Sequence, residues 1–401
     1  MPSTLSITKN KYLKGTIMKE KLIQTIDELN VEYVKIWEDI CNIESPWSYK
    51  AGVDAVGEYF IRYANERGWK VEVFEQERAG NVVILTMNPE VDAAPIAFSG
   101  HMDTVHEVGS FGSPAVKVDW ENDRIYGPGV TDCKGGIMVG ILAMEALRKV
   151  GYKARPVVMY LQSDEESSGK LSADATINYI CERAQGSVGF FNLENSHRGK
   201  LTMGMKGIVS FQFTVTGVEA HSAGCATNGS NAILEAAYKI IELEKFKDRE
   251  GLTCCCSIIN GGTKHNIVPG ECKFIANVRF AKRSQLDEFI EAANKICEDI
   301  HVPGCTCTMV LPRIRPAMEI CDRNMELFHK MNEIWRENGF EEAQMSTSLG
   351  GSDAANVSSA GVPTVEGLGN LGGMIHTPKE YAVISSLAEY AKRLAIVALN
   401  L

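Results

Sequence analysis

Features that would assign this chain to several functional classes are absent from its sequence. No stretch contains the about 18 uninterrupted apolar residues of a membrane-spanning helix, and the first residues lack the apolar run of a signal peptide. Positive charge is in the minority, since 41 Lys and Arg oppose 51 Asp and Glu and the formal net charge is -10. We expect a cytoplasmic protein because the signal peptide and the membrane span are missing. Because phosphate groups would be repelled, we expect no nucleic-acid partner and no membrane partner.

Short motifs of other enzyme classes are also missing. The 12 cysteines show neither a CxxC pair nor the paired spacing of a secreted disulfide framework, so we expect them to be reduced and mostly buried. The stretch Gly350-Gly351-Ser352-Asp353 lacks the Lys-Ser/Thr of a phosphate-binding loop, although the helix that it opens could face an anionic ligand. No GxGxxG stretch has the strand, helix and acidic residue of a dinucleotide site, and there is no GxSxG elbow of a serine hydrolase.

The chain is long enough for two domains, and its 45% of apolar residues can fill two cores. From about residue 18 to 200, amphipathic helices alternate with short apolar runs, which predicts an α/β fold. Between 204 and 313 the order becomes strand, helix, strand, strand, helix, strand, which is a split βαβ unit. The first pattern then resumes, so we predict a discontinuous domain over 1–203 and 314–401 with a second domain inserted over 204–313. Residues before about Thr16 carry no core pattern and are assigned no function.

Polar residues follow several of the short apolar runs, at the point where each run stops. His101 ends the run in FSGHMDTVH, Glu165 and Glu166 follow the run in LQSDEESSG, and Glu194 follows the run in FNLEN. Ligands of open α/β sheets collect beyond the carboxyl ends of the strands, so we expect these side chains to converge on one edge. Two further strings, GPGVTDCKGG with Asp132 and GGMIHTPKEY with His376, lie in similar glycine-flanked loops.

These residues are of the types that zinc prefers. A pair of zinc ions about 3.5 to 4 Å apart needs one bridging carboxylate and roughly two further ligands each, from imidazole and carboxylate groups. A single histidine is more often structural, and a DEE triplet is more often a solvated turn. The strings occur together and in order at strand-to-loop breaks, which favours a metal site. One of two adjacent carboxylates can bind metal while the other accepts a proton from water.

The strings resemble those of the M20 family of dinuclear zinc peptidases and amidohydrolases, and most closely its glutamate carboxypeptidases, over nearly the whole chain. The resemblance implies a zinc-peptidase domain with a mixed central sheet and an inserted ferredoxin-like domain that forms a homodimer. It implies two zinc ions per subunit, with Co²⁺ or Mn²⁺ as possible substitutes, and Glu165 as the general base. The implied metal ligands are the bridging Asp132, His101 and Glu194 on one ion, and Glu166 and His376 on the other.

Further roles follow from the same resemblance. Asp103 would orient the ring of His101, as carboxylate partners of metal-bound histidines commonly do. A cis peptide bond would follow Asp132, although this chain has Cys133 where many members have Asp. His221 in TGVEAHSAG would reach the site of the partner subunit and stabilise the oxyanion there.

Five residues are candidates for substrate binding. Asn266 and Arg279 match positions that hold a terminal carboxylate or carbonyl, and a guanidinium suits bidentate carboxylate capture. Lys200 and Arg315 match basic residues near an acidic substrate group, although both residue types are also common on surfaces. Gly351, in the stretch Gly350-Gly351-Ser352-Asp353, is the fifth candidate for substrate binding.

We therefore predict a metal-dependent hydrolase of an amide bond in a small peptide or N-acyl amino acid with a free carboxylate. A carboxypeptidase with a preference for C-terminal glutamate is favoured, and an N-acyl amino acid deacylase or a dipeptidase is the alternative. A non-catalytic carboxylate-binding protein is a further alternative of another class. It is disfavoured because a degenerate relative would be expected to lose metal ligands or the base, and all of them are present.

Overall fold

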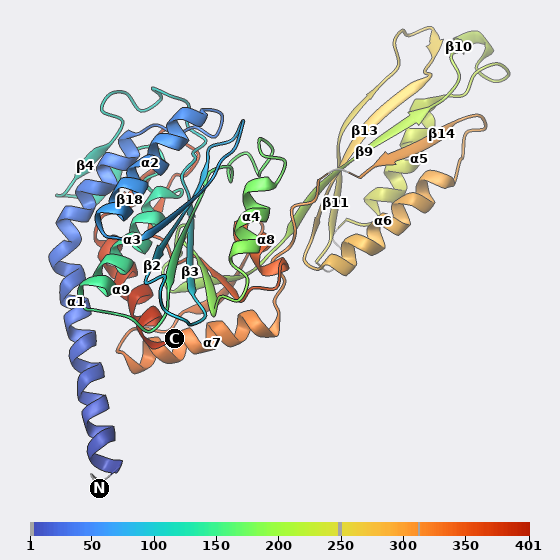
Figure 1. The fold of residues 1–401 in the computed structure, drawn as a ribbon. Helices are drawn as coiled ribbons and strands as arrows, with labels where there is room; N and C mark the ends of the chain where they lie inside the picture. Colours follow the sequence, from blue (N-terminus) through green and yellow to red (C-terminus); the bar gives the residue numbers. More distant parts are fainter. Residues whose placement is uncertain (1–3, 248–250, 312) are drawn as a thin grey trace. The chain divides into compact units, whose positions relative to one another are not determined.

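The chain forms two compact units in a computed structural model, which describes residues 4–247, 251–311 and 313–401. Unit 1 comprises Met1–Met203, Ile320–Ser346 and Ser352–Leu401, and unit 2 comprises Gly204–Glu319 and Thr347–Gly351. Unit 2 therefore extends beyond the predicted insertion and takes in a second short segment. Each unit is described below by itself (Figure 1).

Unit 1 is built on an eight-stranded mixed sheet. In spatial order its strands are β1 (Lys70–Phe74), β2 (Val82–Met87), β6 (Val157–Gln162), β3 (Ile96–His101), β7 (Gly189–Asn192), β16 (Thr364–Glu366), β8 (Lys200–Met205) and β15 (Gln344–Ser348). Strands β6, β3, β7 and β16 are parallel to their neighbours in this run, whereas β2 pairs with β1 and β6 in the antiparallel sense. The predicted α/β class with a mixed central sheet is confirmed.

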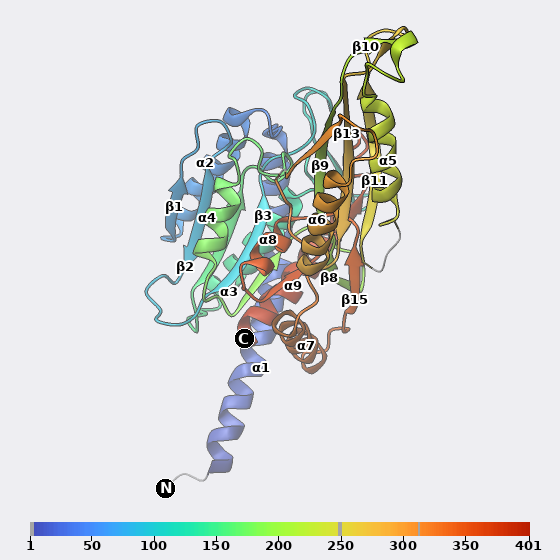
Figure 2. The ribbon, with the colours of Figure 1, turned by 90° about the vertical axis from the view of Figure 1, so that its right-hand side faces the viewer.

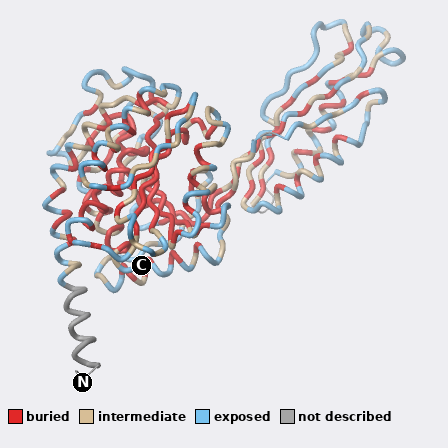
Figure 3. Tube along the Cα trace, viewed as in Figure 1, coloured by how far each residue is buried: buried red, intermediate tan, exposed pale blue. Residues whose placement is uncertain are grey.

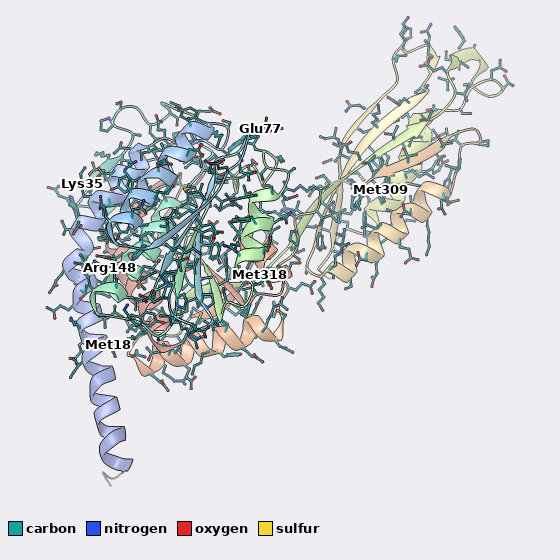
Figure 4. All side chains as sticks on the ribbon, viewed as in Figure 1. Met18, Lys35, Glu77, Arg148, Met309 and Met318 are labelled. Carbon is teal, nitrogen blue, oxygen red and sulfur yellow. The ribbon has the colours of Figure 1, made fainter. Side chains whose placement is uncertain are left out.

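Helices cover both faces of this sheet. They are α1 (Thr4–Asn42), α2 (Lys50–Glu66), α3 (Lys134–Lys149), α7 (Asp322–Glu337) and α9 (Ser385–Asn400) around one core cluster, and α4 (Ala175–Arg183) and α8 (Asp353–Ser359) against the other face. Helix α1 starts at Thr4, so the chain before Thr16 is helical from that residue on. The expectation that this segment carries no core pattern stays a prediction, and residues 1–3 lie outside the described residues. Arg148, near the end of α3, donates two hydrogen bonds of 2.7 Å to Glu145 of the same helix (Figure 4).

The central strands are buried because helices lie on both sides of them. Every residue of β3 and of β6 is buried, which is the burial expected of parallel strands in α/β proteins. In Figure 3 the buried stretches of unit 1 gather along this sheet. The apolar runs in the sequence are continuous for the same reason, and each ends where the strand leaves the core.

A smaller sheet in unit 1 was not predicted. Its strands, in order, are β17 (Gly372–Gly373), β18 (Tyr381–Val383), β5 (Arg124–Tyr126) and β4 (Lys117–Asp119). All its pairings are antiparallel. The sheet brings the segment after β5 next to the loop between β17 and β18, although these parts are far apart in the sequence.

Unit 2 contains a four-stranded antiparallel sheet covered by two helices. The strands, in order, are β11 (Thr253–Gly261), β13 (Glu271–Phe280), β9 (Gly207–Thr216) and β14 (Thr306–Val310), the helices are α5 (Ala232–Glu244) and α6 (Arg283–Glu298), and a short ribbon is formed by β10 (Ala220–His221), the 3-10 turn η1 (Ser222–Gly224) and β12 (Ile267–Val268). The order of strands and helices is the split βαβ order read from the sequence.

Only one face of this sheet is buried. Burial alternates along β9 and β13, and the buried side chains pack with those of α5 and α6. The two helices lie beside these strands in Figure 2. Met309 of β14 is partly buried against the same core (Figure 4). No helix in the described part of the chain is long and apolar enough to cross a membrane.

Candidate metal centre

Three neighbouring parallel strands end at the same edge of the central sheet. Strand β3 lies between β6 and β7, with His101 opposite Gln162 and Ser99 opposite Asn192. His101 is the last residue of β3, Glu165 and Glu166 follow β6, and Glu194 follows β7. The strand ends therefore place these side chains in one region of unit 1.

Asp132 lies at the centre of this group. Its Oδ1 atom is 3.1 Å from Nε2 of His101, and its Oδ2 atom is 3.1 Å from Nε2 of His376. Glu194 Oε1 is 3.6 Å from the same nitrogen of His101, and Glu166 Oε2 is 3.5 Å from the same nitrogen of His376. The two oxygens of one carboxylate thus face two separate histidine–glutamate pairs.

Local backbone geometry sets the position of two of these residues. The Asp132–Cys133 peptide bond is cis. His376, in the loop between β17 and β18, has a φ of 59°, a left-handed conformation that few residues other than glycine adopt. Non-glycine residues in this region are frequent at functional sites, where the surrounding structure holds them in place.

Asp103 connects His101 to the segment that carries the two adjacent glutamates. It is fully buried, and its carboxylate accepts hydrogen bonds from the backbone N–H groups of Glu165 (3.3 Å) and Glu166 (2.9 Å). Nδ1 of His101 lies closer to the backbone carbonyl oxygen of Asp103 (2.9 Å) than to its carboxylate (3.5 Å). Asp103 therefore faces the ring of His101 with both its backbone carbonyl and its carboxylate, and the backbone contact is the shorter of the two.

The carboxylates of the group differ in their surroundings: contacts with His101 and His376 hold the pKa of buried Asp132 below its usual range, whereas Glu166 and Glu194 are less well compensated. Burial raises the pKa of Glu166 to about 7 and raises the pKa of Glu194 well above its usual range. The negative charge of Glu165 adds to both shifts, which places its carboxylate within electrostatic reach of both residues. The buried Oε1 atom of Glu166 has no hydrogen-bond partner. Such an arrangement is unfavourable unless a cation binds there.

The residues present fit a pair of divalent cations. Imidazole and carboxylate groups are the ligands that zinc prefers, and ligand atoms of His101, Asp132 and Glu166 lie within 4.8 Å of one another. The set contains three carboxylates and two imidazoles, with one carboxylate in the bridging position. Cys133 Sγ also lies within 4.8 Å of ligand atoms of His101 and Glu194, and it donates a hydrogen bond to the carbonyl oxygen of Leu193 (3.3 Å).

The predicted oxyanion residue lies in unit 2. His221 is exposed in the short ribbon, where it pairs with Ile267 and its Nδ1 atom accepts a hydrogen bond from the backbone N–H of Ala223 (3.2 Å). Asn266 is next to it, because its carbonyl oxygen accepts a hydrogen bond from the backbone N–H of Ser222 (3.0 Å). The structure thus brings His221 and Asn266 together within unit 2.

Three further candidates meet at another part of unit 2. Arg279 on β13 donates a hydrogen bond to the carbonyl oxygen of Leu349 (2.5 Å). A Cβ atom on Gly351 would lie 3.2 Å from the side chain of Arg315. Lys200 is exposed at the start of β8 in unit 1.

Two buried residues near Asp132 were not singled out from the sequence. His106 and Glu380 form a hydrogen bond of 2.6 Å, and Glu380 also accepts hydrogen bonds from the backbone around Asp132. Both lie within the motif strings, in GHMDTVH and HTPKEY, and their position there is the only sequence signal that could have indicated them.

Comparisons with known proteins identify the family of this chain. The family model "Peptidase family M20/M25/M40" matches residues 97–400. Carboxypeptidase G2 of Pseudomonas sp. (strain RS-16) is 25% identical over 393 residues, covering 95% of this chain and 93% of the relative. Succinyl-diaminopimelate desuccinylase of Nitrosospira multiformis is 27% identical, covering 78% of this chain and 85% of the relative.

Solved structures show the same fold. An aminopeptidase of Bacillus cereus superposes with a TM-score of 0.74 at 19% identity, covering 92% of this chain and 97% of its own. A protein of Bacillus subtilis described as a dinuclear metal-binding peptidase from the M20 family gives a TM-score of 0.69 at 16% identity, covering 93% and 98%. The chain belongs to the M20/M25/M40 peptidase family, whose members are metal-dependent peptidases and amidohydrolases.

Proposed function

We propose that this protein is a zinc-dependent carboxypeptidase that removes a C-terminal acidic residue, preferably glutamate, from a small peptide or an N-acyl amino acid. One observation carries the hydrolytic part of the proposal. The two carboxylate oxygens of Asp132 each face a separate histidine–glutamate pair, an arrangement that fits two cations and one bridging ligand. His101 and Glu194 would hold one ion, and His376 and Glu166 would hold the other.

The zinc ions, when bound, would polarise the scissile carbonyl and lower the pKa of an attacking water. Glu165 would accept the proton of this water and deliver it to the leaving amine. The carboxylate of Asp103 accepts hydrogen bonds from the backbone N–H groups of Glu165 and Glu166 and so fixes this segment. One of the two adjacent carboxylates, Glu166, can then bind metal while the other, Glu165, accepts the proton. His221 of one subunit would donate a hydrogen bond to the oxyanion formed in the site of the other subunit.

The proposed preference for a free carboxylate and an acidic side chain rests on basic residues, of which Arg279 and Arg315 lie in unit 2 and Lys200 lies in unit 1. Arg279 would bind the terminal carboxylate of the substrate with its guanidinium, assisted by Asn266. Arg315, next to Gly351, and Lys200 would interact with an acidic side chain. The relatedness to both carboxypeptidase G2 and the desuccinylase supports a substrate with acidic groups, and it leaves an N-acyl amino acid deacylase or a dipeptidase as alternatives.

A homodimer is part of the proposal because His221 would act across subunits. Unit 2 presents an exposed apolar surface, formed by Ile233, Leu234, Tyr238 and Ile241 of α5 and by Ile258 and Ile259 of β11. Strand β11 is also an edge strand of its sheet. Exposed apolar side chains beside an open sheet edge are typical of interfaces between subunits.

The substrate proposal is tested with a panel assayed on the purified, zinc-loaded protein. N-acyl-glutamate, N-acyl-leucine and a set of dipeptides are compared by kcat/KM. We expect N-acyl-glutamate to be hydrolysed most efficiently, and Arg315→Met to reduce that advantage without abolishing hydrolysis of N-acyl-leucine. Equal rates on acidic and apolar substrates would remove the glutamate preference, and no hydrolysis of any amide would contradict the whole proposal.

Assembly is tested independently of activity. Ile241→Glu places a charge on the exposed apolar surface of unit 2, whereas Val108→Glu changes an exposed apolar residue of unit 1 and serves as the control. We expect light scattering to give a dimer for the unaltered chain and for Val108→Glu, and a larger monomer fraction for Ile241→Glu. A monomeric unaltered chain would overturn this part of the proposal.

A further inference from the structure

Glu380 is a buried carboxylate that the proposed mechanism does not use. It has no solvent exposure and lies four residues after His376, just before β18. A carboxylate without solvent contact is tolerated only when several donors compensate its charge. Its partners therefore indicate what it does.

Four hydrogen bonds reach this carboxylate from two other segments. Oε1 accepts from the backbone N–H groups of Thr131 (2.8 Å) and Asp132 (3.1 Å). Oε2 accepts from the backbone N–H of Gly129 (3.3 Å) and is 2.6 Å from Nε2 of His106. One side chain thus accepts hydrogen bonds from three backbone N–H groups of the loop that carries Asp132.

The segments that meet here are those that carry the candidate metal ligands. His106 lies five residues after His101, the N–H donors immediately precede and include Asp132, and Glu380 itself follows His376. One further hydrogen bond connects the same two segments: Thr131 Oγ1 donates to the backbone carbonyl oxygen of Tyr381, which follows Glu380 (2.7 Å). Three of the five ligand-bearing regions, those of His101, Asp132 and His376, are therefore connected at a single carboxylate.

We propose that Glu380 is a positioning residue of the metal centre, which holds the backbone at Asp132 so that its two carboxylate oxygens face the two histidines. The inference rests on the proposed metal-dependent function. Glu380 would not contact the metal ions or the substrate. His106 assists it, because its ring is nearly buried, packs edge-on against Phe111 and keeps one donor directed at Oε2.

The effect of losing Glu380 follows from these contacts. In Glu380→Gln an NH2 group replaces one of the two acceptor oxygens, so either Gly129 N–H and His106, or Thr131 N–H and Asp132 N–H, would face a donor and the loop would rearrange. The two oxygens of Asp132 would then no longer be fixed toward His101 and His376. Residues that orient metal ligands commonly change metal affinity by about 10–100-fold when they are altered, and we expect an effect of this size.

The test compares Glu380→Gln with Glu235→Gln. Glu235 is also fully buried and also accepts backbone hydrogen bonds, from His301 and Val302, but it lies in the core of unit 2. Zinc affinity is measured by competition with a chelator, and the unfolding temperature is measured on the metal-free forms. We expect Glu380→Gln to weaken zinc binding by about 10–100-fold and Glu235→Gln to leave it unchanged.

A second readout separates positioning from general destabilisation. The visible absorption of the Co²⁺-loaded protein reports coordination geometry, and we expect it to change in Glu380→Gln but not in Glu235→Gln. His106→Leu, which removes the donor to Oε2, should change it in the same direction, whereas His106→Gln, which offers an amide donor, should restore part of the effect. An unaltered spectrum and unaltered zinc affinity in Glu380→Gln would overturn the inference.

Failure of the proposed function gives a different result. If the unaltered chain bound no zinc or Co²⁺, the metal centre itself would be wrong. If it bound both ions and Glu380→Gln bound them equally well, only the role of Glu380 would be wrong.

Discussion

The two units bury carboxylates in opposite ways. In unit 2, Glu235 forms an ion pair with Lys239 and accepts hydrogen bonds from the backbone N–H groups of His301 (3.0 Å) and Val302 (2.6 Å). Burial acts to raise the pKa of Glu235, but these contacts lower it below its usual value. In unit 1, the Glu166 side chain is 6% exposed, one of its oxygens has no partner, and its pKa is raised to about 7.

This contrast distinguishes a carboxylate with a structural role from the carboxylates of the candidate metal centre. A buried carboxylate with its own cation and donors is complete within the chain and holds two elements together. A group of buried carboxylates without a cation is costly in the isolated chain, and the cost is recovered when a metal binds. We therefore expect unit 1 to give up some stability at the proposed metal centre, whereas the Glu235–Lys239 pair of unit 2 is complete without a bound ion.

The largest expected effect concerns the proposed base. Glu165→Gln should reduce kcat by about 10²–10⁴-fold, the usual contribution of a general base, because an amide cannot accept the proton of water. Zinc content should stay at that of the unaltered chain, since Glu165 is not a proposed ligand. Metal analysis and steady-state kinetics on the same preparation check both points, and near-normal turnover would refute the assignment.

Breaking the Glu235–Lys239 ion pair of unit 2 should have the largest effect on the free energy of unfolding among these predictions. Lys239→Met leaves Glu235 buried without its cation and should lower the free energy of unfolding by about 3–5 kcal/mol, as for other broken buried pairs. Adding Glu235→Gln should recover most of this loss, because the amide oxygen still accepts the two backbone hydrogen bonds and no charge remains. Denaturant unfolding of the three chains measures the difference, and a larger loss in the double variant would contradict the comparison.

Glu166 should behave in the opposite way. Glu166→Gln removes a poorly compensated charge, so the metal-free chain should be as stable as the unaltered chain or slightly more stable. The same change should reduce the bound zinc from two ions toward one. Thermal unfolding in the presence of a chelator, together with metal analysis, tests this. A clear loss of metal-free stability would show that Glu166 is structural.

The smallest expected effect is a pH dependence in unit 2. The pKa of Glu235 is lower in the folded chain than its usual value of about 4.3, so its contribution to stability is fully present above that pH. The contribution is lost as the pH falls through the lowered pKa, when the carboxylate becomes protonated. Denaturant unfolding between about pH 5 and pH 3 should therefore show a steeper loss for the unaltered chain than for Glu235→Gln, and identical slopes would argue against the lowered pKa.

Much of the fold could be predicted because its signals are local. Continuous apolar runs that stop at polar residues indicated β3, β6 and β7, and these strands are buried on both faces. The small sheet of β17, β18, β5 and β4 could not be predicted in the same way. Its strands have two or three residues each, too few for any periodicity to appear.

The sequence by itself determined the α/β class and the family, since apolar periodicity and short ordered motifs can be read along the chain. It also supplied the candidate ligand types. Only the tertiary structure decided how these residues meet. Asp132 contacts His376, and His106 contacts Glu380 across 274 residues, through loops that the small sheet holds together. Such contacts depend on packing between distant segments, and no local pattern of residues records them.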